Sequence, residues 1–369
     1  MKRLASLLVG AAVLAAATGT AARADIMVGL AGPMTGGIAA FGEQLKRGGE
    51  KAVADINAKG GVLGQKLQVI IGDDACDPKQ AVSVANDLAS KKVAVVIGHF
   101  CSGSSIPASS VYSESNIVQI SPASTNPQYT ERGLKNTFRV CGRDDAQGPT
   151  AADYVVDHFK GKNVAVIDDM QTYSKGLADA FFGELEKKGV KAVLHDQITA
   201  GEKDYSAVVT KLKQAKADVL FYGGYHPEAA LIARQSKEQG LNIVVVGGDA
   251  LNDPEFWAIA GPAGEGTLVT FNPDATQDPA NAALVKWFKD DQKYEPAGYT
   301  LYAYAALQAW ADAATKAGSV DGAKVEDALR ANKFNTTLGS IGFDAKGDVI
   351  APGFLVYEWK GGKFVYAPK

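Results

Sequence analysis

The sequence predicts an α/β protein of two doubly wound parallel-sheet lobes joined by a three-crossover hinge. Short β-branched runs alternate with amphipathic segments almost to the end, which is typical of parallel sheets covered by helices on both faces. The pattern occurs twice, over residues 25–140 and again over 145–270. The length of 369 residues also exceeds what one hydrophobic core usually organises, which favours two lobes.

The expected strands are the short β-branched runs. They cover residues 26–30, 66–71, 93–97, 117–120, 163–167, 190–194, 218–222 and 243–246. Ligands of doubly wound sheets bind outside the carboxyl ends of the strands, near the switch points. The residues that follow these runs are therefore the candidates for a binding site.

The segments between the strands carry apolar residues at three- and four-residue spacing, and several stop at glycine, as amphipathic helices do. The clearest of them cover residues 42–58, 78–90, 174–189 and 228–240.

From about residue 272 the chain is mainly helical, and it ends in two short strands, 353–359 and 363–367. We expect this part to return to the first lobe and then to cross again. The resulting division gives lobe 1 and lobe 2 the residues 25–143 plus about 273–352, and 144–272 plus about 353–369.

Residues 1–24 have the pattern of a cleaved secretory signal peptide. Lys2 and Arg3 precede an apolar stretch, and the small residues around Arg23 suit cleavage before Asp25. No cysteine follows that could carry a lipid, and no later run of about 18 apolar residues could span a bilayer. We expect an exported, soluble monomer without a membrane anchor.

The charge of the mature chain argues against nucleic acid or a lipid surface as a partner. Three of the 38 basic residues lie in the leader, so 35 remain against 41 acidic ones, a net charge of about −6. No block of like charge stands out.

The three cysteines predict one disulfide and one free thiol in an oxidising compartment. Cys76 and Cys101 follow neighbouring expected strands at equivalent places, so we pair them. Cys141 is then free, and we expect a small buried hydrophobic side chain.

Signatures of catalysis are missing from the sequence. The four histidines form neither HExxH nor a metal-like spacing with the cysteines, GxSxG and a Walker lysine are absent, and GxGxxG never follows a strand. The pairs Asp73-Asp74 and Asp168-Asp169 would suit a metal or general-acid role, but acids of loops and helix starts are the simpler interpretation. We expect no enzyme, no metal and no cofactor; a secreted hydrolase is the rival, and it lacks a nucleophile–base pair.

Two strand ends are rich in small hydroxyl residues. They are residues 98–105, "GHFCSGSS", and 121–127, "SPASTNP". Amide groups and hydroxyls at a helix start favour an anion, and the absence of lysine or arginine in both stretches favours a carboxylate over a phosphate. Ordinary helix capping by serine and threonine is the alternative.

Three strand ends of the second lobe, residues 170–176, 222–228 and 246–252, offer Tyr173, Tyr225 and Asp249. An acid complements a cation, so hydroxyls opposite an acid predict a zwitterion held at both ends. Packing alone is the alternative explanation for each tyrosine.

Six strings carry a family resemblance that covers essentially all of the mature chain. They are "AVADINAKGG", "DDACDPKQAV", "IGHFCSGSS", "DAQGPTAA", "TAGEKDYS" and "YGGYHPE". Together they resemble the periplasmic leucine/isoleucine/valine-binding proteins of ATP-binding-cassette importers. The resemblance implies a type I periplasmic binding protein that closes on an amino acid in the periplasm and delivers it to a membrane permease.

The resemblance also implies roles for polar residues. Ser102 and Thr125 would receive the α-carboxylate with main-chain N–H groups, while the Ala123 carbonyl and the Asp249 carboxylate would bind the ammonium. The family often has glutamate where this chain has Asp249, so the ammonium must shift, bind through a water, or be reached by further closure.

The walls of the site follow from the same resemblance. Tyr173 and Tyr225 would close from the second lobe, and Phe41, Phe100 and Cys101 would line the side-chain pocket. The predicted disulfide matches the family's, whereas Phe41 replaces a tyrosine or tryptophan and makes a drier wall. Leucine, isoleucine and valine are the expected ligands; an aromatic amino acid, an amide or an aromatic acid, for transport or for sensing, is the alternative.

Overall fold

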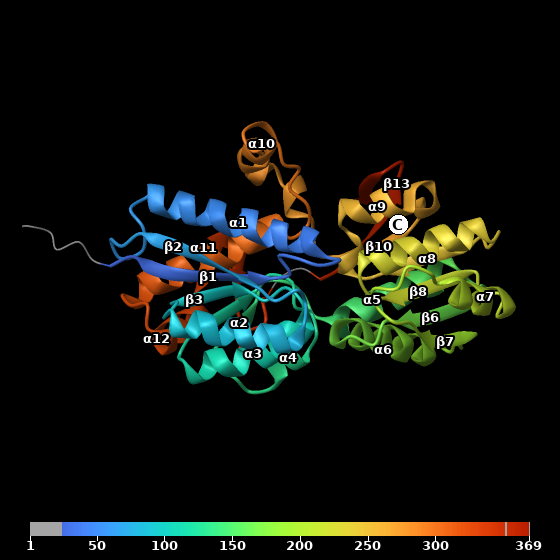
Figure 1. Cartoon of the computed structure of the whole chain (residues 1–369), viewed down its shortest axis with the longest axis horizontal. Helices are drawn as coiled ribbons and strands as arrows, with labels where there is room; N and C mark the ends of the chain where they lie inside the picture. Colours follow the sequence, from blue (N-terminus) through green and yellow to red (C-terminus); the bar gives the residue numbers. More distant parts are fainter. Residues whose placement is uncertain (1–23, 351–352, 369) are drawn as a thin grey trace, which may run out of the picture.

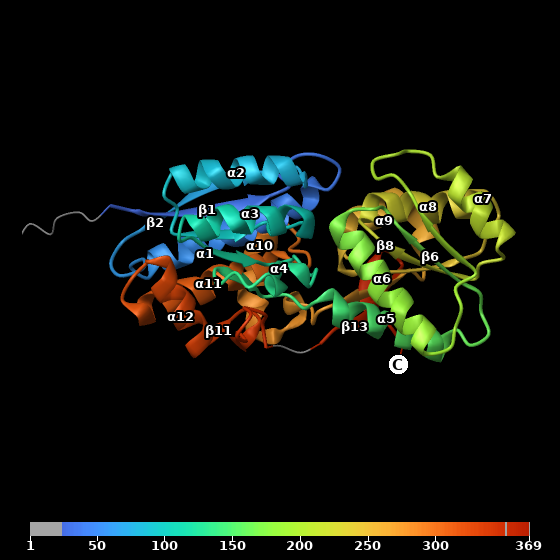
Figure 2. The same cartoon turned by 90° about the horizontal axis from the view of Figure 1, so that it is seen from below.

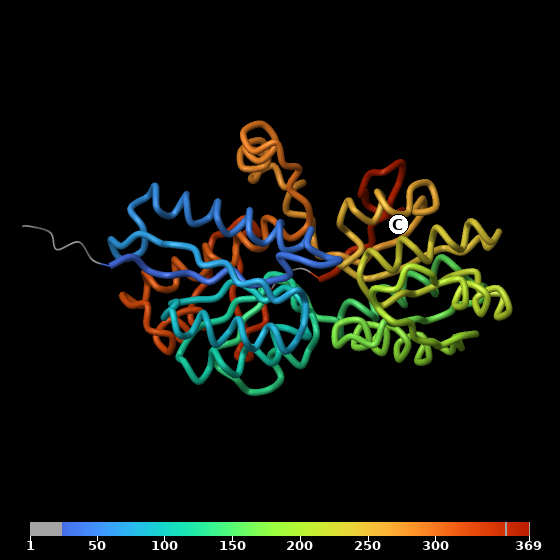
Figure 3. Tube along the Cα trace, in the orientation of Figure 1, coloured from blue at the N-terminus to red at the C-terminus, as the bar shows by residue number. Residues whose placement is uncertain are grey.

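The computed structural model describes residues 24–350 and 353–368 as two lobes that lie end to end (Figure 1). The predicted signal peptide lies outside the described residues. The chain passes between the lobes three times, so neither lobe is one continuous segment (Figure 3).

Lobe 1 is built on a parallel five-stranded sheet with the order β2-β1-β3-β4-β5. Its strands are β1 (Ile26–Gly32), β2 (Leu67–Asp73), β3 (Val95–Gly98), β4 (Val118–Ser121) and β5 (Thr137–Arg139). Every residue of β3, β4 and β5 is buried, as expected of parallel strands covered on both faces.

Helices cover both faces of this sheet (Figure 2). The helices α2 (Pro78–Ser90) and α3 (Ser102–Glu114) lie on one face, with α4 (Gln128–Glu131) after them. On the other face α1 (Ala39–Ala58) packs against α11 (Thr300–Ala317), with α12 (Gly322–Ala331) beside it. Helix α10 (Ala282–Asp290) and the hairpin of β11 (Lys333–Thr336) and β12 (Gly339–Gly342) complete this half.

Lobe 2 repeats the strand order of lobe 1 and extends it, as β7-β6-β8-β9-β10-β13-β14. The parallel strands are β6 (Val164–Asp168), β7 (Leu194–Gln197), β8 (Val219–Gly223), β9 (Val244–Gly247) and β10 (Leu268–Phe271). The last two strands, β13 (Leu355–Lys360) and β14 (Lys363–Tyr366), are antiparallel additions at the edge. The sequence pattern thus correctly predicted two similar doubly wound lobes.

The helices of lobe 2 also form two layers. One layer holds α5 (Asp144–His158) and α6 (Thr172–Lys187), and the other holds α7 (Ser206–Gln214), α8 (His226–Glu238) and α9 (Pro254–Ala260). There are also short 3-10 turns. The turns η1 (Asp249–Leu251) and η3 (Ala275–Gln277) follow β9 and β10, η2 (Gly261–Gly264) follows α9, and η4 (Pro279–Asn281) precedes α10. Within the described residues, no helix is long and apolar enough to cross a membrane.

The three passages between the lobes run from β5 to α5, from β10 to η3, and from β12 to β13. The third passage runs alongside the end of β5, where Asp348 bridges Arg139 in a parallel register. The Asp348 carboxylate also accepts from Arg139 Nε at 2.6 Å and from Arg143 Nη1 at 2.7 Å. Ion pairs therefore tie the first and third passages to each other.

Several strand predictions were wrong in detail. The strand expected at 190–194 lies at Leu194–Gln197, because the apolar residues before it belong to a turn and a loop. It is half exposed because it is the edge strand of its sheet. Strands β5 and β10 and the β11–β12 hairpin were missed. All four are only three or four residues long, too short to give a periodic signal.

Candidate functional site

The carboxyl ends of β3 and β4 in lobe 1 face those of β6, β8 and β9 in lobe 2, as predicted for parallel sheets. A small cavity of about 10 Å³ lies between them. It is lined by Phe100, Ser102, Ala123, Tyr173, Tyr225, Asp249 and Ala250. Six of the nine predicted site residues thus surround one small cavity.

The stretch after β3 is fixed by its backbone and by a buried histidine. A Cβ atom on Gly98 would lie 2.1 Å from the carbonyl oxygen of Ala31, so only glycine lets β3 approach β1 this closely. His99 then contacts Asp74 through Nδ1 at 2.5 Å and Tyr112 through Nε2 at 2.9 Å, all three side chains being buried. This histidine is structural, as expected.

The predicted disulfide between Cys76 and Cys101 is formed, with a Cα–Cα distance of 5.7 Å. It joins the ends of β2 and β3 directly before Ser102, the first residue of α3. The first N–H groups of a helix have no intrahelical acceptor, so Ser102 presents both amide and hydroxyl at the cavity. Cys141 is free and buried, and burial raises the pKa of its thiol.

The second hydroxyl-rich stretch is held from behind by Arg139. This buried side chain donates to the carbonyls of Ser124 at 2.5 Å and Asn126 at 3.1 Å, and it pairs with Asp348. Arg139 therefore fixes the course of the loop that carries Ala123. Sequence reasoning did not select Arg139, because it ends the short strand β5, which the sequence did not predict.

Thr125 is fully buried but does not line the cavity. Its carbonyl accepts from the amide of Asp144 at 3.0 Å. Its hydroxyl lies near the Asp144 carboxyl group and lowers the pKa of that group, without a hydrogen bond of standard geometry to any described residue.

Asp249 begins the short turn after β9 and is the buried acid of lobe 2 at the cavity. Its Oδ1 accepts from Tyr173 Oη at 2.8 Å and from Gln147 Nε2 at 3.0 Å, and its Oδ2 accepts from Tyr299. Burial raises the pKa of Asp249, and the three hydrogen bonds oppose that shift. All three donors are neutral, so none of them supplies a positive charge that balances the Asp249 carboxylate.

Tyr173 and Tyr225 cover the cavity from lobe 2, with ring centroids 5.2 Å apart. The Tyr225 hydroxyl lies 3.6 Å from Cys76 Sγ, so it reaches across to the disulfide of lobe 1. Burial raises the pKa of both phenols well above the usual range, which keeps them neutral hydrogen-bond donors.

Aromatic rings form the apolar wall of the cavity. Phe100 lines it directly, whereas Phe41 stacks behind Phe100 with centroids 4.4 Å apart. Tyr299 packs edge-on against Phe100 at 5.1 Å. Phe41 therefore supports the wall rather than lining it, and Cys101 contributes through its disulfide rather than as a lining residue.

Further contacts across the cleft lie outside the cavity. Gln44 Nε2 of α1 donates to Asp253 Oδ2 at 2.6 Å, and Asn126 Nδ2 donates to the carbonyl of Thr172 at 2.9 Å. Phe41 also meets the ring of His226 edge-on at 5.2 Å. These contacts describe a closed arrangement of the two lobes.

Of the described residues, one group could hold a metal ion, namely His226, Asp253 and Glu255. Asp253 already accepts from the amide of Glu255 at 2.8 Å as the cap of α9, and from Gln44. His226 Nε2 lies 3.1 Å from the exposed Glu255 carboxylate. The group is thus already engaged in structural contacts.

The two predicted acid pairs also have structural partners. Asp73 accepts from the amides of Met34 and Ala75, and Asp74 from that of Cys76. In lobe 2, Asp168 and Asp169 accept from backbone amides two residues on. These acids thus accept hydrogen bonds from the backbone of the turns that follow β2 and β6.

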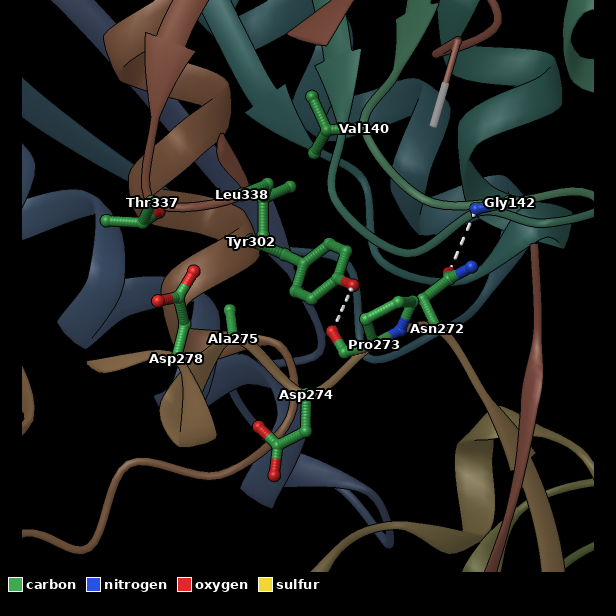
Figure 4. A pocket seen from close by; sticks show the side chains of 10 residues that line it. All are labelled: Val140, Gly142, Asn272, Pro273, Asp274, Ala275, Asp278, Tyr302, Thr337 and Leu338. Atoms are coloured by element: carbon green, nitrogen blue, oxygen red, sulfur yellow. Dashed lines mark hydrogen bonds between the residues drawn. The ribbon is translucent and has the colours of Figure 1, made fainter. Parts of the chain in front are cut away.

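A larger cavity of about 110 Å³ lies beside the hinge (Figure 4). Its walls come from the first and second passages and from α11 and the loop before β12, with Val140, Gly142, Asn272, Pro273, Asp274, Ala275, Asp278, Tyr302, Thr337 and Leu338. The amide of Gly142 donates to Asn272 Oδ1 at 3.0 Å, and Tyr302 Oη donates to the Pro273 carbonyl at 2.9 Å. These bonds link the two passages to each other and to lobe 1.

Sequence reasoning also missed Gln147 and Tyr299. Gln147 lies inside α5, and Tyr299 directly precedes α11, so neither follows a strand. No local pattern distinguished them, because they reach Asp249 from elements more than 45 residues away in the sequence.

The comparisons with known proteins agree with this architecture. A family model described as periplasmic binding protein matches residues 25–363. A Leu/Ile/Val-binding protein homolog from Brucella suis is 50% identical over 94% of this chain and 93% of its own. A leucine-binding protein from Thermotoga maritima has a similar structure, with a TM-score of 0.85 and 30% identity over 93% of this chain and 98% of its own. A branched-chain amino acid binding protein from Streptococcus pneumoniae, solved with isoleucine, gives a TM-score of 0.84 and 26% identity over 92% and 97%.

Proposed function

Because this chain belongs to the periplasmic binding protein family, we propose that it captures branched-chain and other aliphatic L-amino acids and delivers them to an ATP-binding-cassette permease. The observation that carries this proposal is the cavity between the lobes, with Ser102 on one side and Asp249 on the other. The ligand is a zwitterion with an apolar tail.

The two ends of the zwitterion have different partners. The start of α3 offers N–H groups, the positive end of a helix dipole and the Ser102 hydroxyl, which suit a carboxylate. Asp249 and the carbonyl of Ala123 suit an ammonium, because both are hydrogen-bond acceptors. Thr125 lies behind the cavity wall, in the same loop as Ala123.

The apolar tail lies against Phe100, which Phe41 supports. A lysine or glutamate ligand would bring a second charge against these rings, and a charge buried without a partner is costly. This wall therefore favours aliphatic amino acids.

Binding and closure are coupled, because each lobe supplies only part of the contacts. Charged groups leave water only when both sets of partners are present, so the closed form is populated mainly with ligand. A permease can then recognise the closed shape. The protein forms and breaks no covalent bond in this cycle.

Calorimetry with the proteinogenic amino acids tests the proposal. We expect leucine, isoleucine or valine to bind with a Kd near 1 μM, or about −8 kcal/mol, and lysine and glutamate to bind more weakly. Preference for a charged amino acid, or no binding of any amino acid, would overturn it.

The second candidate keeps the fold and changes the ligand to an aromatic amino acid, an amide or an aromatic acid. An aromatic acid has no ammonium and would leave Asp249 with neutral donors only. Benzoate and phenylalanine therefore belong in the same calorimetric panel. Tighter binding of either one than of leucine would favour this candidate.

A further inference from the structure

A contact between the lobes, outside the cavity, joins the loop after β4 to the start of α6. Asn126 of this loop is 4% exposed, and its Nδ2 donates to the carbonyl of Thr172, the first residue of α6, at 2.9 Å. Its Oδ1 accepts from the amide of Gln128 at 2.9 Å, so lobe 1 itself holds the side chain in this orientation. The Asn126 amide group therefore meets lobe 2 in a fixed direction.

Gly176 of α6 leaves the space that the Asn126 side chain occupies. A Cβ atom on Gly176 would lie 2.4 Å from Asn126 Nδ2, which is far inside the van der Waals distance. The φ of Gly176 is not positive, so the backbone does not require glycine at this position. Glycine also weakens the interior of a helix relative to alanine. The close approach of Asn126 is therefore the feature that calls for glycine here.

The same loop reaches the ligand site. The amide of Asn126 donates to Ser102 Oγ at 3.2 Å, and the Asn126 carbonyl accepts from Arg139. Within the described part of the chain, the Ser102 hydroxyl has no acceptor for its own proton, so it can donate that proton to a ligand at the cavity. Asn126 thus contacts Ser102 through its main chain and lobe 2 through its side chain.

On the basis of the proposed function, we propose that Asn126 is a positioning residue that links carboxylate binding at Ser102 to lobe closure, and that Gly176 provides the space in which it docks. A carboxylate on Ser102 fixes the loop of lobe 1, and the Asn126 amide group then binds α6 beside Gly176. A methyl group at position 176 would either hold the lobes apart or turn the amide group away from Thr172. Both changes remove the hydrogen bond between the lobes.

The first test compares Gly176→Ala with Gly183→Ala, a matched change in the same helix, where a Cβ atom would meet nothing within 4 Å. Calorimetry should give roughly 5- to 100-fold weaker leucine binding for Gly176→Ala, the effect of a buried donor without a partner. Gly183→Ala should bind leucine as the unchanged protein does. Without ligand, both variants should melt at the same temperature as the unchanged protein or higher, because alanine favours a helix.

Binding kinetics add a readout that a general loss of stability would not give. Leucine enters the open protein, and the contact between Asn126 and α6 forms only on closure. Stopped-flow measurements should therefore show the loss for Gly176→Ala in the dissociation rate, with an association rate within about twofold of the unchanged protein.

The second test asks whether Gly176 acts through Asn126. Asn126→Ser keeps an oxygen for the bond from the Gln128 amide and removes the group that reaches α6. Alone, it should weaken leucine binding by roughly 3- to 10-fold, the effect of one hydrogen bond. In this background Gly176→Ala should cost less than about twofold more, because the methyl group no longer meets an amide group.

Three results would overturn the inference. They are leucine binding by Gly176→Ala as tight as that of the unchanged protein, an equal loss from Gly176→Ala with and without Asn126→Ser, and a lower melting temperature of ligand-free Gly176→Ala. If Asn126→Ser does not fold, Asn126→Ala takes its place, and the two glycine variants decide alone if neither folds. If the unchanged protein binds an aromatic acid instead of an amino acid, the proposed function fails, and the same variants are compared with that acid, whose carboxylate Ser102 would still bind.

Discussion

Tyr299 of lobe 1 donates a hydrogen bond to Asp249 of lobe 2, so the acid at the cavity is held from both sides of the cleft. The ring of Tyr299 also packs edge-on against Phe100 at 5.1 Å. A closed lobe arrangement and a preorganised acid are therefore parts of one set of contacts.

Removal of Asp249 should weaken amino-acid binding most. Asp249→Ala should reduce the affinity for leucine by roughly 2–5 kcal/mol, because the buried ammonium loses its counter-charge. Calorimetry measures this, with Glu238→Ala on the exposed end of α8 as the control. Equal affinity of Asp249→Ala and the unchanged protein would remove Asp249 from the site.

The bond between Gln44 and Asp253 lies outside the cavity and should act on closure alone. Gln44→Ala removes this bond and also the one that Gln44 Oε1 accepts from the amide of Tyr299 at 2.8 Å, so it should weaken the binding of every ligand by a similar factor of roughly 10 to 100, the effect of two hydrogen bonds. Small-angle scattering of the ligand-free variant should give a larger radius of gyration. Glu43→Ala is the control, since Glu43 pairs with Arg47 on the same helix. A loss confined to one ligand would contradict this role.

The disulfide should stabilise the fold and the start of α3. It closes a loop of 25 residues, which contributes about 3 kcal/mol in the chain-entropy model. Unfolding by urea with and without a reductant measures this difference. The double variant Cys76→Ala, Cys101→Ala should have the stability of the reduced protein, with or without the reductant. Equal stability of the reduced and oxidised protein would contradict the expectation.

Asp169 predicts a pH dependence of stability. Burial raises its pKa to about 6, so the folded state favours the protonated acid. Its contribution to stability is then complete below about pH 4 and is lost as the pH rises through 6. Relative to Asp169→Asn, which cannot ionise, the unchanged protein should lose about 2 kcal/mol of unfolding free energy between pH 4 and 7.

Urea unfolding at several pH values measures that difference. The control is Asp204→Asn, because the hydroxyl of Ser206 lowers the pKa of the exposed Asp204. Its difference from the unchanged protein should change with pH in the opposite direction. A flat difference for Asp169→Asn would show that the raised pKa is wrong.

Much of the fold was predictable, because strands such as β1 and β8 are continuous apolar runs followed by amphipathic helices. Short strands without periodicity, such as β5, were not predictable. They form because neighbouring strands provide a ladder, which is a tertiary cause that no local pattern records.

The site was predictable as far as it lies at strand ends. Ser102, Tyr225 and Asp249 each follow a strand closely and reach the cavity. Tyr299 at the start of α11 and Gln147 inside α5 reach Asp249 from positions that are set by the way the chain passes between the lobes. Such positions follow from the packing of distant elements rather than from local sequence.

The most direct test of the central claim is a crystal structure of the protein with bound leucine or valine. The account predicts the ligand between the lobes, with its carboxylate on Ser102 and the start of α3 and its ammonium on Asp249. A ligand outside the cleft, or one that contacts neither Ser102 nor Asp249, would contradict it.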